Sequence, residues 1–201
     1  MNDIFSCWSD RKRLRFIILT ALIYAALLIP FKPFAIIPGF SEARPANFVP
    51  ALFGVLFGPA AAWGSAFGNL IADIASTAAM GSAGTLSLGS IFGFIGNFLY
   101  AYVAWKVWML VVEKGLKRIE ALQIGLFCLA SLTGGAVCAL VIGIGVFVMG
   151  LQTFPQAMVM IMVITFNNFL PAAVLGSIGL ALGYEKAKES GWLYLEPAKD
   201  S

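Results

Sequence analysis

Four long stretches of this 201-residue chain contain no charged residue, and they constrain its fold more than any other feature. They cover residues 16–31, 45–72, 74–105 and 121–184. A helix needs about 20 mainly apolar residues to cross a bilayer. Only 11% of the residues are charged and 60% are hydrophobic, which is too little charge to cover a soluble fold of this size. The sequence therefore predicts an integral membrane protein and excludes an ordinary soluble enzyme.

The number of spans follows from where these runs break and from the positive charges. The run 121–184 is long enough for two helices and breaks at 150–155, while the small polar stretch 76–85 is typical of a loop. Basic residues in short loops mark the cytoplasmic side, and they gather at 11–15, 106–118 and 186–199. If all three groups are cytoplasmic, the run 45–72 must turn back on itself. Gly58, followed by a proline, is the expected turn.

The predicted fold is an all-α integral membrane protein, a compact six-transmembrane-helix bundle with its N- and C-termini cytoplasmic. It forms a single transmembrane domain over 1–201 in the cell membrane. Its helices are expected at about 14–31, 45–58, 59–77, 86–112, 121–149 and 156–184, with cytoplasmic tails 1–13 and 185–201. The second helix is only about 21 Å long, so it spans only if neighbours shield it or the membrane thins locally.

Polar side chains inside the membrane are costly and indicate function. The topology places most of them in the outer half of the bundle, and Asn69 and Asp73 share one helix face because they are four residues apart. We expect them to surround a cavity open to the outside, beneath the apolar loop 32–44 and the loop 76–85. The candidate substrate contacts are Glu42, Arg44, Asn69, Asp73, Asn97, Asn167 and Asn168.

Structural alternatives stand beside each of these assignments. Glu42 and Arg44 fit a solvated pair at a helix start, where an acidic residue also suits the helix dipole. Asp73 fits an ion pair with Arg44 that closes the bundle. The asparagines fit hydrogen bonds between helices. The outward clustering of these residues supports a substrate site more strongly than any one of them does.

Several classes of chemistry lack their residues here. The chain has no histidine, and its three cysteines form no CxxC pair, so we expect no metal site and no cofactor. Asp73 is a lone intramembrane carboxylate, which leaves a paired-aspartate protease without its second acid. There is no phosphate-binding GxxxxGK[ST] motif. With a net charge of only +3, we expect no nucleic-acid partner. The sequence predicts a protein that is not an enzyme.

Two segments resemble a known family. Residues 44–59, which end in Leu56-Phe57-Gly58-Pro59, and residues 63–73 are similar to the second and third helices of the substrate-binding S components of energy-coupling factor (ECF) transporters. Ala21-Leu-Ile-Tyr-Ala25 matches the AxxxA motif that is common on the first helix of that family. The segment 44–73 is most similar to the generic or queuosine-precursor-like group of S components.

The resemblance implies a transport mechanism. An S component binds a vitamin, a nucleobase-like molecule or a related micronutrient from outside, and its first loop closes over that substrate. It then docks on a transmembrane T component that carries two ATPase subunits, and ATP hydrolysis drives release inside. On this basis Ala21 and Ala25 form the docking face, although packing inside the bundle also explains them. Only motif positions in the first three helices carry over from the family.

Two functions of other classes stay open. One is a solitary ion- or proton-coupled transporter, in which Asp73 carries the proton or cation. The other is a structural subunit of a membrane complex that binds no small molecule.

Overall fold

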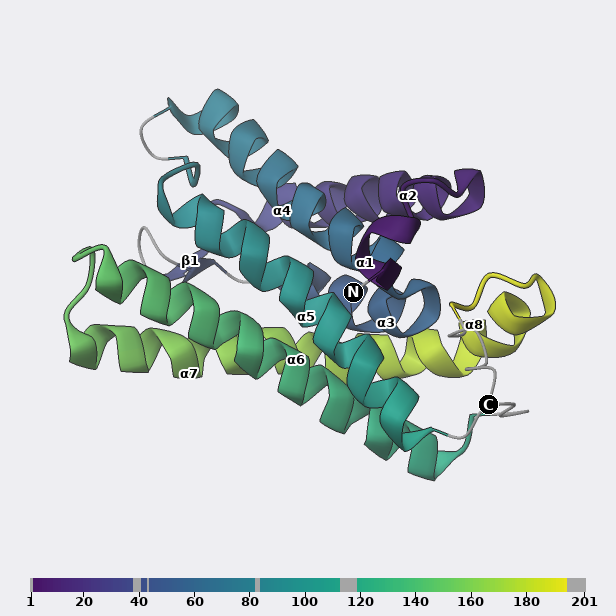
Figure 1. Cartoon of the computed structure of the whole chain (residues 1–201). Coiled ribbons are helices and arrows are strands. Elements are labelled where there is room, and N and C mark those ends of the chain that lie inside the picture. Colours follow the sequence, from purple (N-terminus) through teal and green to yellow (C-terminus); the bar gives the residue numbers. More distant parts are fainter. Residues whose placement is uncertain (1, 38–40, 43, 82–83, 113–118, 195–201) are drawn as a thin grey trace.

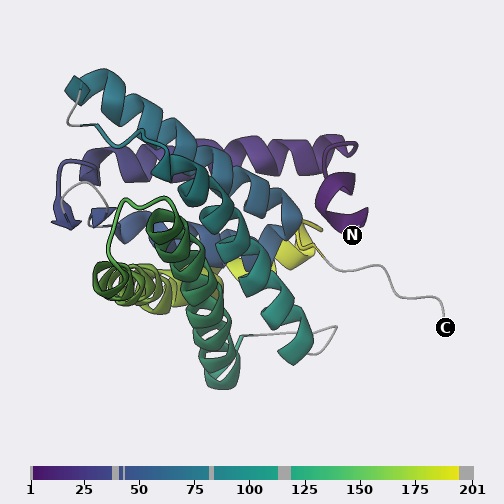
Figure 2. The same cartoon turned by 60° about the vertical axis from the view of Figure 1, so that its left-hand side comes forward.

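We analysed a computed structural model of the chain, which describes residues 2–37, 41–42, 44–81, 84–112 and 119–194. Long helices lie side by side in a bundle, and Figures 1 and 2 show them from two sides. The elements are α1 (Asn2–Ser6), α2 (Arg11–Leu28), η1 (Ile29–Phe31), β1 (Ala35–Ile37), β2 (Ser41–Glu42), η2 (Pro45–Asn47), α3 (Phe48–Phe57), α4 (Pro59–Met80), α5 (Gly89–Val111), α6 (Ala121–Val148), α7 (Phe154–Pro171), η4 (Ala172–Gly176) and α8 (Ser177–Glu189).

Local sequence signals explain where these helices begin and end. Gly58 has a φ of 58°, a left-handed conformation that glycine adopts without a steric penalty, and the proline after it begins α4. The structure thus confirms the expected turn between α3 and α4. Glu120 and Gln123 form a capping box at the start of α6. Near the end of the chain Pro171 interrupts the helix, and the five-residue π-helical turn η4 joins α7 to α8.

The structure also differs from the sequence-based expectations. The loop 32–44 contains a short antiparallel pairing of β1 with β2, so the described chain is not purely helical. Helix α4 continues to Met80, so the first residues of the expected loop 76–85 are helical. Both expected tails are partly folded, because α1 and the start of α2 lie within 1–13 and α8 extends to Glu189.

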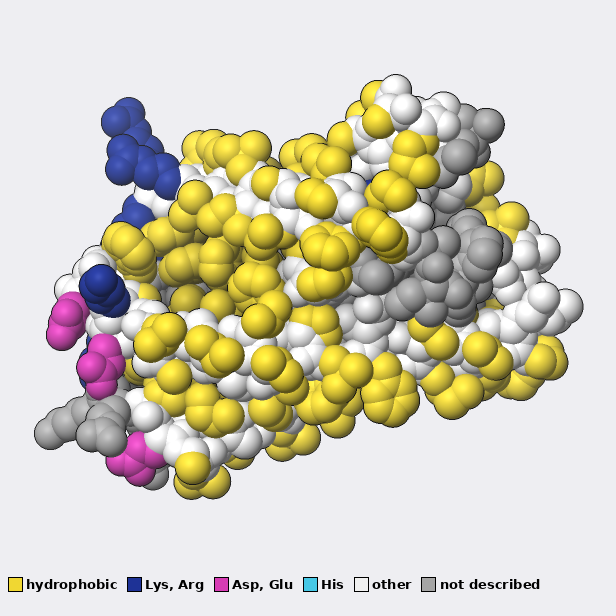
Figure 3. Space-filling view, turned by 180° about the vertical axis from the view of Figure 1, so that it is seen from behind, with side chains coloured by type: hydrophobic (Ala, Val, Ile, Leu, Met, Phe, Trp, Pro, Cys, Tyr) yellow, Lys and Arg dark blue, Asp and Glu magenta, His cyan; other side chains and the backbone are white. Residues whose placement is uncertain are grey.

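The helices have the length and surface of a membrane protein. Among the described residues, four helical segments are long and apolar enough to cross a bilayer: Arg11–Phe31, Gly89–Val111, Ala121–Val148 and Phe154–Glu189. Many large apolar side chains are exposed along the bundle, for example Leu182, which is 77% exposed. Figure 3 shows them over the flanks, with charged side chains gathered at one end. The protein is therefore a multi-pass membrane protein.

Glycines let the helices approach closely. A Cβ at Gly64 would lie 2.7 Å from the Ile17 carbonyl oxygen, and one at Gly68 would lie 2.9 Å from the Ala21 carbonyl oxygen. Helix α4 therefore packs directly on the backbone of α2. The short helix α3 is largely buried, and it packs against α5, α4 and η4. This packing positions η2, which precedes α3, beside α7.

The residues that follow α8 lie over the end of the short helix α3. We call residues 191–194 the C-terminal strap. The Tyr194 backbone N–H donates to the Leu56 carbonyl oxygen at 2.9 Å, and the Tyr194 ring packs on Gly58. The last carbonyl groups of a helix have no partner within it. The strap therefore supplies a hydrogen-bond donor to one of the last carbonyl groups of α3.

Basic residues at the start of α2 hold this strap in place. Arg13 donates to the Trp192 carbonyl oxygen at 3.2 Å, and its guanidinium lies 4.6 Å from the centre of the Tyr194 ring. The Lys12 ammonium donates to the Gly191 carbonyl oxygen. The Tyr194 ring also meets Trp105 edge to face, with ring centroids 5.2 Å apart. The start of α2 and the C-terminal strap are thus joined.

Replacement of Tyr194 should destabilise the protein. Tyr194→Ala removes the contacts with Trp105 and Arg13 and leaves a gap over Gly58, so we expect the free energy of unfolding to fall by about 3 kcal/mol. Trp192→Ala is the matched control, because Trp192 is 46% exposed and its loss should cost about 1 kcal/mol or less. Unfolding in detergent, followed by tryptophan fluorescence, measures both. Equal losses would show that the Tyr194 contacts contribute nothing specific.

Candidate functional site

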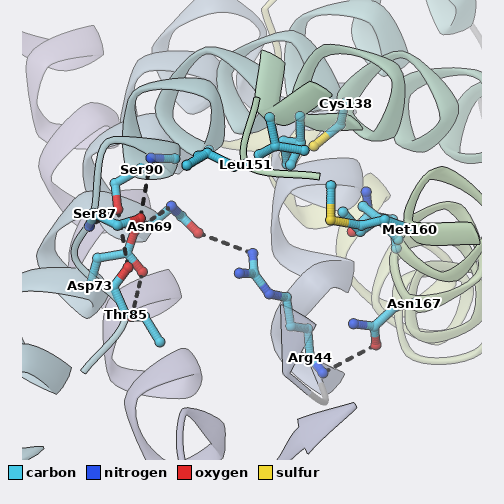
Figure 4. Close-up of a pocket in the computed structure, with 16 residues that line it drawn as sticks. Arg44, Asn69, Asp73, Thr85, Ser87, Ser90, Cys138, Leu151, Met160 and Asn167 are labelled. Carbon is cyan, nitrogen blue, oxygen red and sulfur yellow. Dashed lines mark hydrogen bonds between the residues drawn. The ribbon is translucent and has the colours of Figure 1, made fainter. Parts of the chain in front are cut away.

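A cavity of about 80 Å³ opens between α4, α5, α6 and α7, toward the end of the bundle that carries the β1–β2 hairpin. One water molecule needs about 10–15 Å³ of such space, so the cavity can hold a small ligand or several waters. Polar groups from α4 and the following loop line one side, and apolar groups and sulfur atoms from α6 and α7 line the other (Figure 4). The lining residues are Arg44, Asn69, Asp73, Thr85, Ser87, Gly89, Ser90, Gly93, Cys138, Ile142, Val146, Leu151, Met160, Ile164, Asn167 and Asn168.

Asp73 is the centre of the polar side. It forms a buried ion pair with Lys32, and the two side chains are 6% and 2% exposed. The Thr85 hydroxyl donates to the same carboxylate oxygen at 2.8 Å. The Asn69 amide donates to the other oxygen at 3.3 Å, which confirms the expected shared helix face. The carboxylate is therefore held by three elements of the chain.

Arg44 lies at the border between the loop and the helices. Pro45 begins η2, and it keeps Arg44 out of the helical conformation, at φ −126° and ψ 63°. The backbone N–H of Arg44 donates to the Asn167 side-chain oxygen at 3.2 Å. Its guanidinium donates to the Asn69 side-chain oxygen at 3.1 Å. Both contacts direct the guanidinium along the cavity, as Figure 4 shows.

A second group of polar residues, which we call the amide layer, consists of Tyr24, Asn47, Asn97 and Asn168, and all four are buried. The Tyr24 hydroxyl lies 2.7 Å from the Asn47 side-chain oxygen and 2.8 Å from that of Asn97. Asn47 in turn donates to the Asn168 side-chain oxygen. A buried polar group without a partner is costly in this environment, so the layer fixes α2, η2, α5 and α7 relative to one another.

The helix distortion at Pro171 supplies one acceptor to this region. Proline has no N–H, and the next amide, of Ala172, donates to the Phe169 carbonyl oxygen. The carbonyl oxygen of Asn168 instead accepts from the Tyr100 hydroxyl at 2.9 Å. The interruption of α7 thus ties this helix to α5 beside the cavity.

Five of the seven expected substrate contacts line the cavity: Arg44, Asn69, Asp73, Asn167 and Asn168. Asn97 does not line it and belongs to the amide layer, where it also donates to the Gly93 carbonyl oxygen at 2.8 Å. Glu42 lies in the backbone of β2, and its side chain is outside the described part of the structure.

Ala21 and Ala25, the expected docking residues, are buried inside the protein. They are 6% and 4% exposed, and the face of α2 that carries them packs on α4. This burial favours the alternative that the sequence left open, packing within the bundle. In this structure a partner could not contact these two side chains without displacing α4.

Four residues of the site were not predicted from the sequence: Lys32, Tyr24, Asn47 and Thr85. Lys32 did carry a signal, because Lys32 and Arg44 are the basic residues that fall outside the three clusters of positive charge. Tyr24 and Asn47 carried none that separates them from ordinary interfacial or capping residues. No group of three potential metal ligands occurs among the residues that the structure describes.

Comparison with known proteins identifies the family. The family model described as QueT transporter matches residues 15–183, which is most of the chain. No curated protein and no solved structure matches it. The matched region contains all the helices that line the cavity, and the match agrees with the queuosine-precursor-like group that the sequence resembles. The chain therefore belongs to the QueT transporter family.

Proposed function

We propose that this protein is the substrate-binding S component of an ECF-type ABC importer, and that it captures a queuosine precursor or a related base from outside the cell. The observation that carries this proposal is the cavity, which is enclosed by membrane helices and places Arg44 and several side-chain amides around a small space. Family membership supports a transport role. Because the sequence has no nucleotide-binding GxxxxGK[ST] motif, ATP hydrolysis would come from partner subunits, a T component and two ATPase subunits.

The proposed topology is a single domain of six spans with both termini cytoplasmic. It is supported by the charged side chains that gather at one end of the bundle (Figure 3) and by the exposed basic residues at the start of α2 and in the last turn of α8, two segments that lie at the end opposite the β1–β2 hairpin (Figure 1). In this orientation the cavity faces outside. The helix α3 has 10 residues, about 15 Å of helical rise, so it cannot cross the bilayer alone. Most of it is buried against α4, α5 and η4, which shield it.

The cavity suits a flat polar heterocycle. Arg44 and Asn69 on one side offer a charged donor and an amide, which can pair with the carbonyl and amino groups along the edge of a purine-like ring. Met160 and Ile164 on the other side offer apolar contact for the ring face. Asn167 and Asn168 add amide groups at the border between the two sides.

A gradient-driven transporter that uses Asp73 is the alternative. The surroundings of Asp73 argue against it, because Lys32, Thr85 and Asn69 already occupy its two carboxylate oxygens, and a transported cation would have to displace them.

Small molecules released from the detergent-purified protein test the proposal, with mass spectrometry as the readout. We expect one purine-like base in a stoichiometric amount, and we expect added queuosine-precursor base, but not riboflavin or thiamine, to bind in a titration. Release of an unrelated vitamin would overturn the substrate class. Uptake that survives loss of the ATPase subunits and collapses with an uncoupler would overturn the S-component role.

A further inference from the structure

We propose that Lys32, Asp73 and Thr85 form a clasp that restricts access to the cavity, and that Asp73 is a positioning residue rather than a substrate contact. This inference rests on the proposed function for its meaning, but its test requires no substrate. The clasp joins three elements: Lys32 directly after η1, Asp73 on α4, and Thr85 in the segment that leads into α5.

The clasp is buried. Lys32 lies at the foot of the loop 32–44, yet its side chain is 2% exposed and directed at Asp73. A lysine in an outer loop would keep its ammonium in water unless an opposite charge compensated for the lost hydration. The ion pair therefore holds the foot of this loop against α4.

One carboxylate oxygen of Asp73 accepts hydrogen bonds from both loops. Asp73 Oδ1 accepts from Lys32 and from the Thr85 hydroxyl. The segment after Thr85 provides Ser87 and Ser90, which line the cavity. Loss of the Asp73 charge would thus release both segments together, and we infer that they open as a unit.

The clasp is also linked to Arg44 through Asn69. The second carboxylate oxygen accepts from the Asn69 amide, and this orients the Asn69 oxygen toward the Arg44 guanidinium (Figure 4). Both oxygens of Asp73 are occupied in this way. The carboxylate therefore orders the Asn69 amide and, through it, the Arg44 guanidinium beside the cavity.

A native cysteine offers a direct measure of closure. Cys138 lines the cavity from α6, and it is only 2% exposed. In a background with Cys7→Ala and Cys128→Ala, a membrane-impermeant maleimide reports the access of water to this thiol alone. The protein is tested whole, in membrane vesicles or intact cells, without added substrate.

Lys32→Met should open the cavity, and Cys138 should react about tenfold faster than in the parent. Because this variant leaves the Asp73 carboxylate buried without its lysine, it can unfold. The double variant Lys32→Met/Asp73→Asn removes both charges, and it should label as fast as Lys32→Met while remaining folded.

Thr85→Val should give a smaller increase in the labelling rate, since it frees one loop only. Lys106→Met is the control, because Lys106 lies over the Trp105 ring, far from the clasp, and it should leave the rate unchanged.

An unchanged labelling rate in the folded double variant and in Thr85→Val would overturn the clasp. The experiment distinguishes failure of the clasp from failure of the proposed function. Fast labelling of the clasp variants, in a protein whose parent binds no base, would retain the clasp and overturn the proposed function. Slow labelling in every variant of a protein that binds its base would retain the proposed function and overturn the clasp.

Discussion

Arg44→Ala should weaken the binding of the queuosine-precursor base by more than about tenfold, which corresponds to a loss of at least about 1.4 kcal/mol of binding free energy. The guanidinium lines the cavity and donates to Asn69, while the Arg44 backbone is held by Asn167. Truncation removes the charged donor from the cavity and leaves the buried Asn69 oxygen without this partner. Isothermal titration of the purified protein measures the change.

Two further variants separate the causes of this loss. Arg44→Lys keeps the positive charge but loses the planar fork of donors, so an intermediate affinity is expected. Arg15→Ala removes an exposed arginine at the other end of the bundle, and it should bind like the parent. A parental affinity for Arg44→Ala would return Arg44 to the structural role of a pair at a helix start.

Gly54→Ala should destabilise the fold although it adds a single methyl group. A Cβ at this position would lie 2.5 Å from the Ala101 carbonyl oxygen and 3.0 Å from the Ala101 Cα, and neither backbone atom can turn away. Helix α3 would have to move off α5, and overpacking of this kind costs about 1–3 kcal/mol. Because α3 follows Arg44 and Asn47, substrate affinity should fall as well. The thermal unfolding midpoint in detergent measures the effect.

Gly183→Ala is the matched control for this substitution. Gly183 lies in α8, and a Cβ there would have no neighbour within 4 Å. Alanine favours the helix more than glycine does, so the control should be neutral or more stable by up to about 1 kcal/mol. Equal behaviour of the two variants would show that the close contact of α3 with α5 is not required.

Much of the fold could be read from the order of residues alone. Long runs without charge predict helices in lipid, because an apolar segment in a bilayer must satisfy its backbone groups internally. The turn at Gly58 was predictable because glycine and proline restrict the backbone locally. The shared face of Asn69 and Asp73 followed from helical periodicity. Each of these predictions depends on residues that are close together in the sequence.

The site was only partly predictable for the same reason. The polar residues Arg44, Asn69, Asp73 and Asn167 stood out because water is absent from the membrane, so an unexplained polar group there is conspicuous. The contacts that hold the surrounding helices together did not stand out. Tyr24 meets Asn97 across 73 positions of the chain, and no local pattern indicates that contact.

The sequence by itself determined that this chain is a helical membrane protein with a few polar residues inside its apolar runs, because lipid imposes helices on long apolar segments. The tertiary structure decided which groups meet. It paired Asp73 with Lys32, 41 residues away, and it placed Ala21 and Ala25 against α4 instead of on the surface. The rotation of each helix about its axis follows from how all its neighbours pack, including the fit of α4 glycines against α2. A single helix sequence does not contain that information.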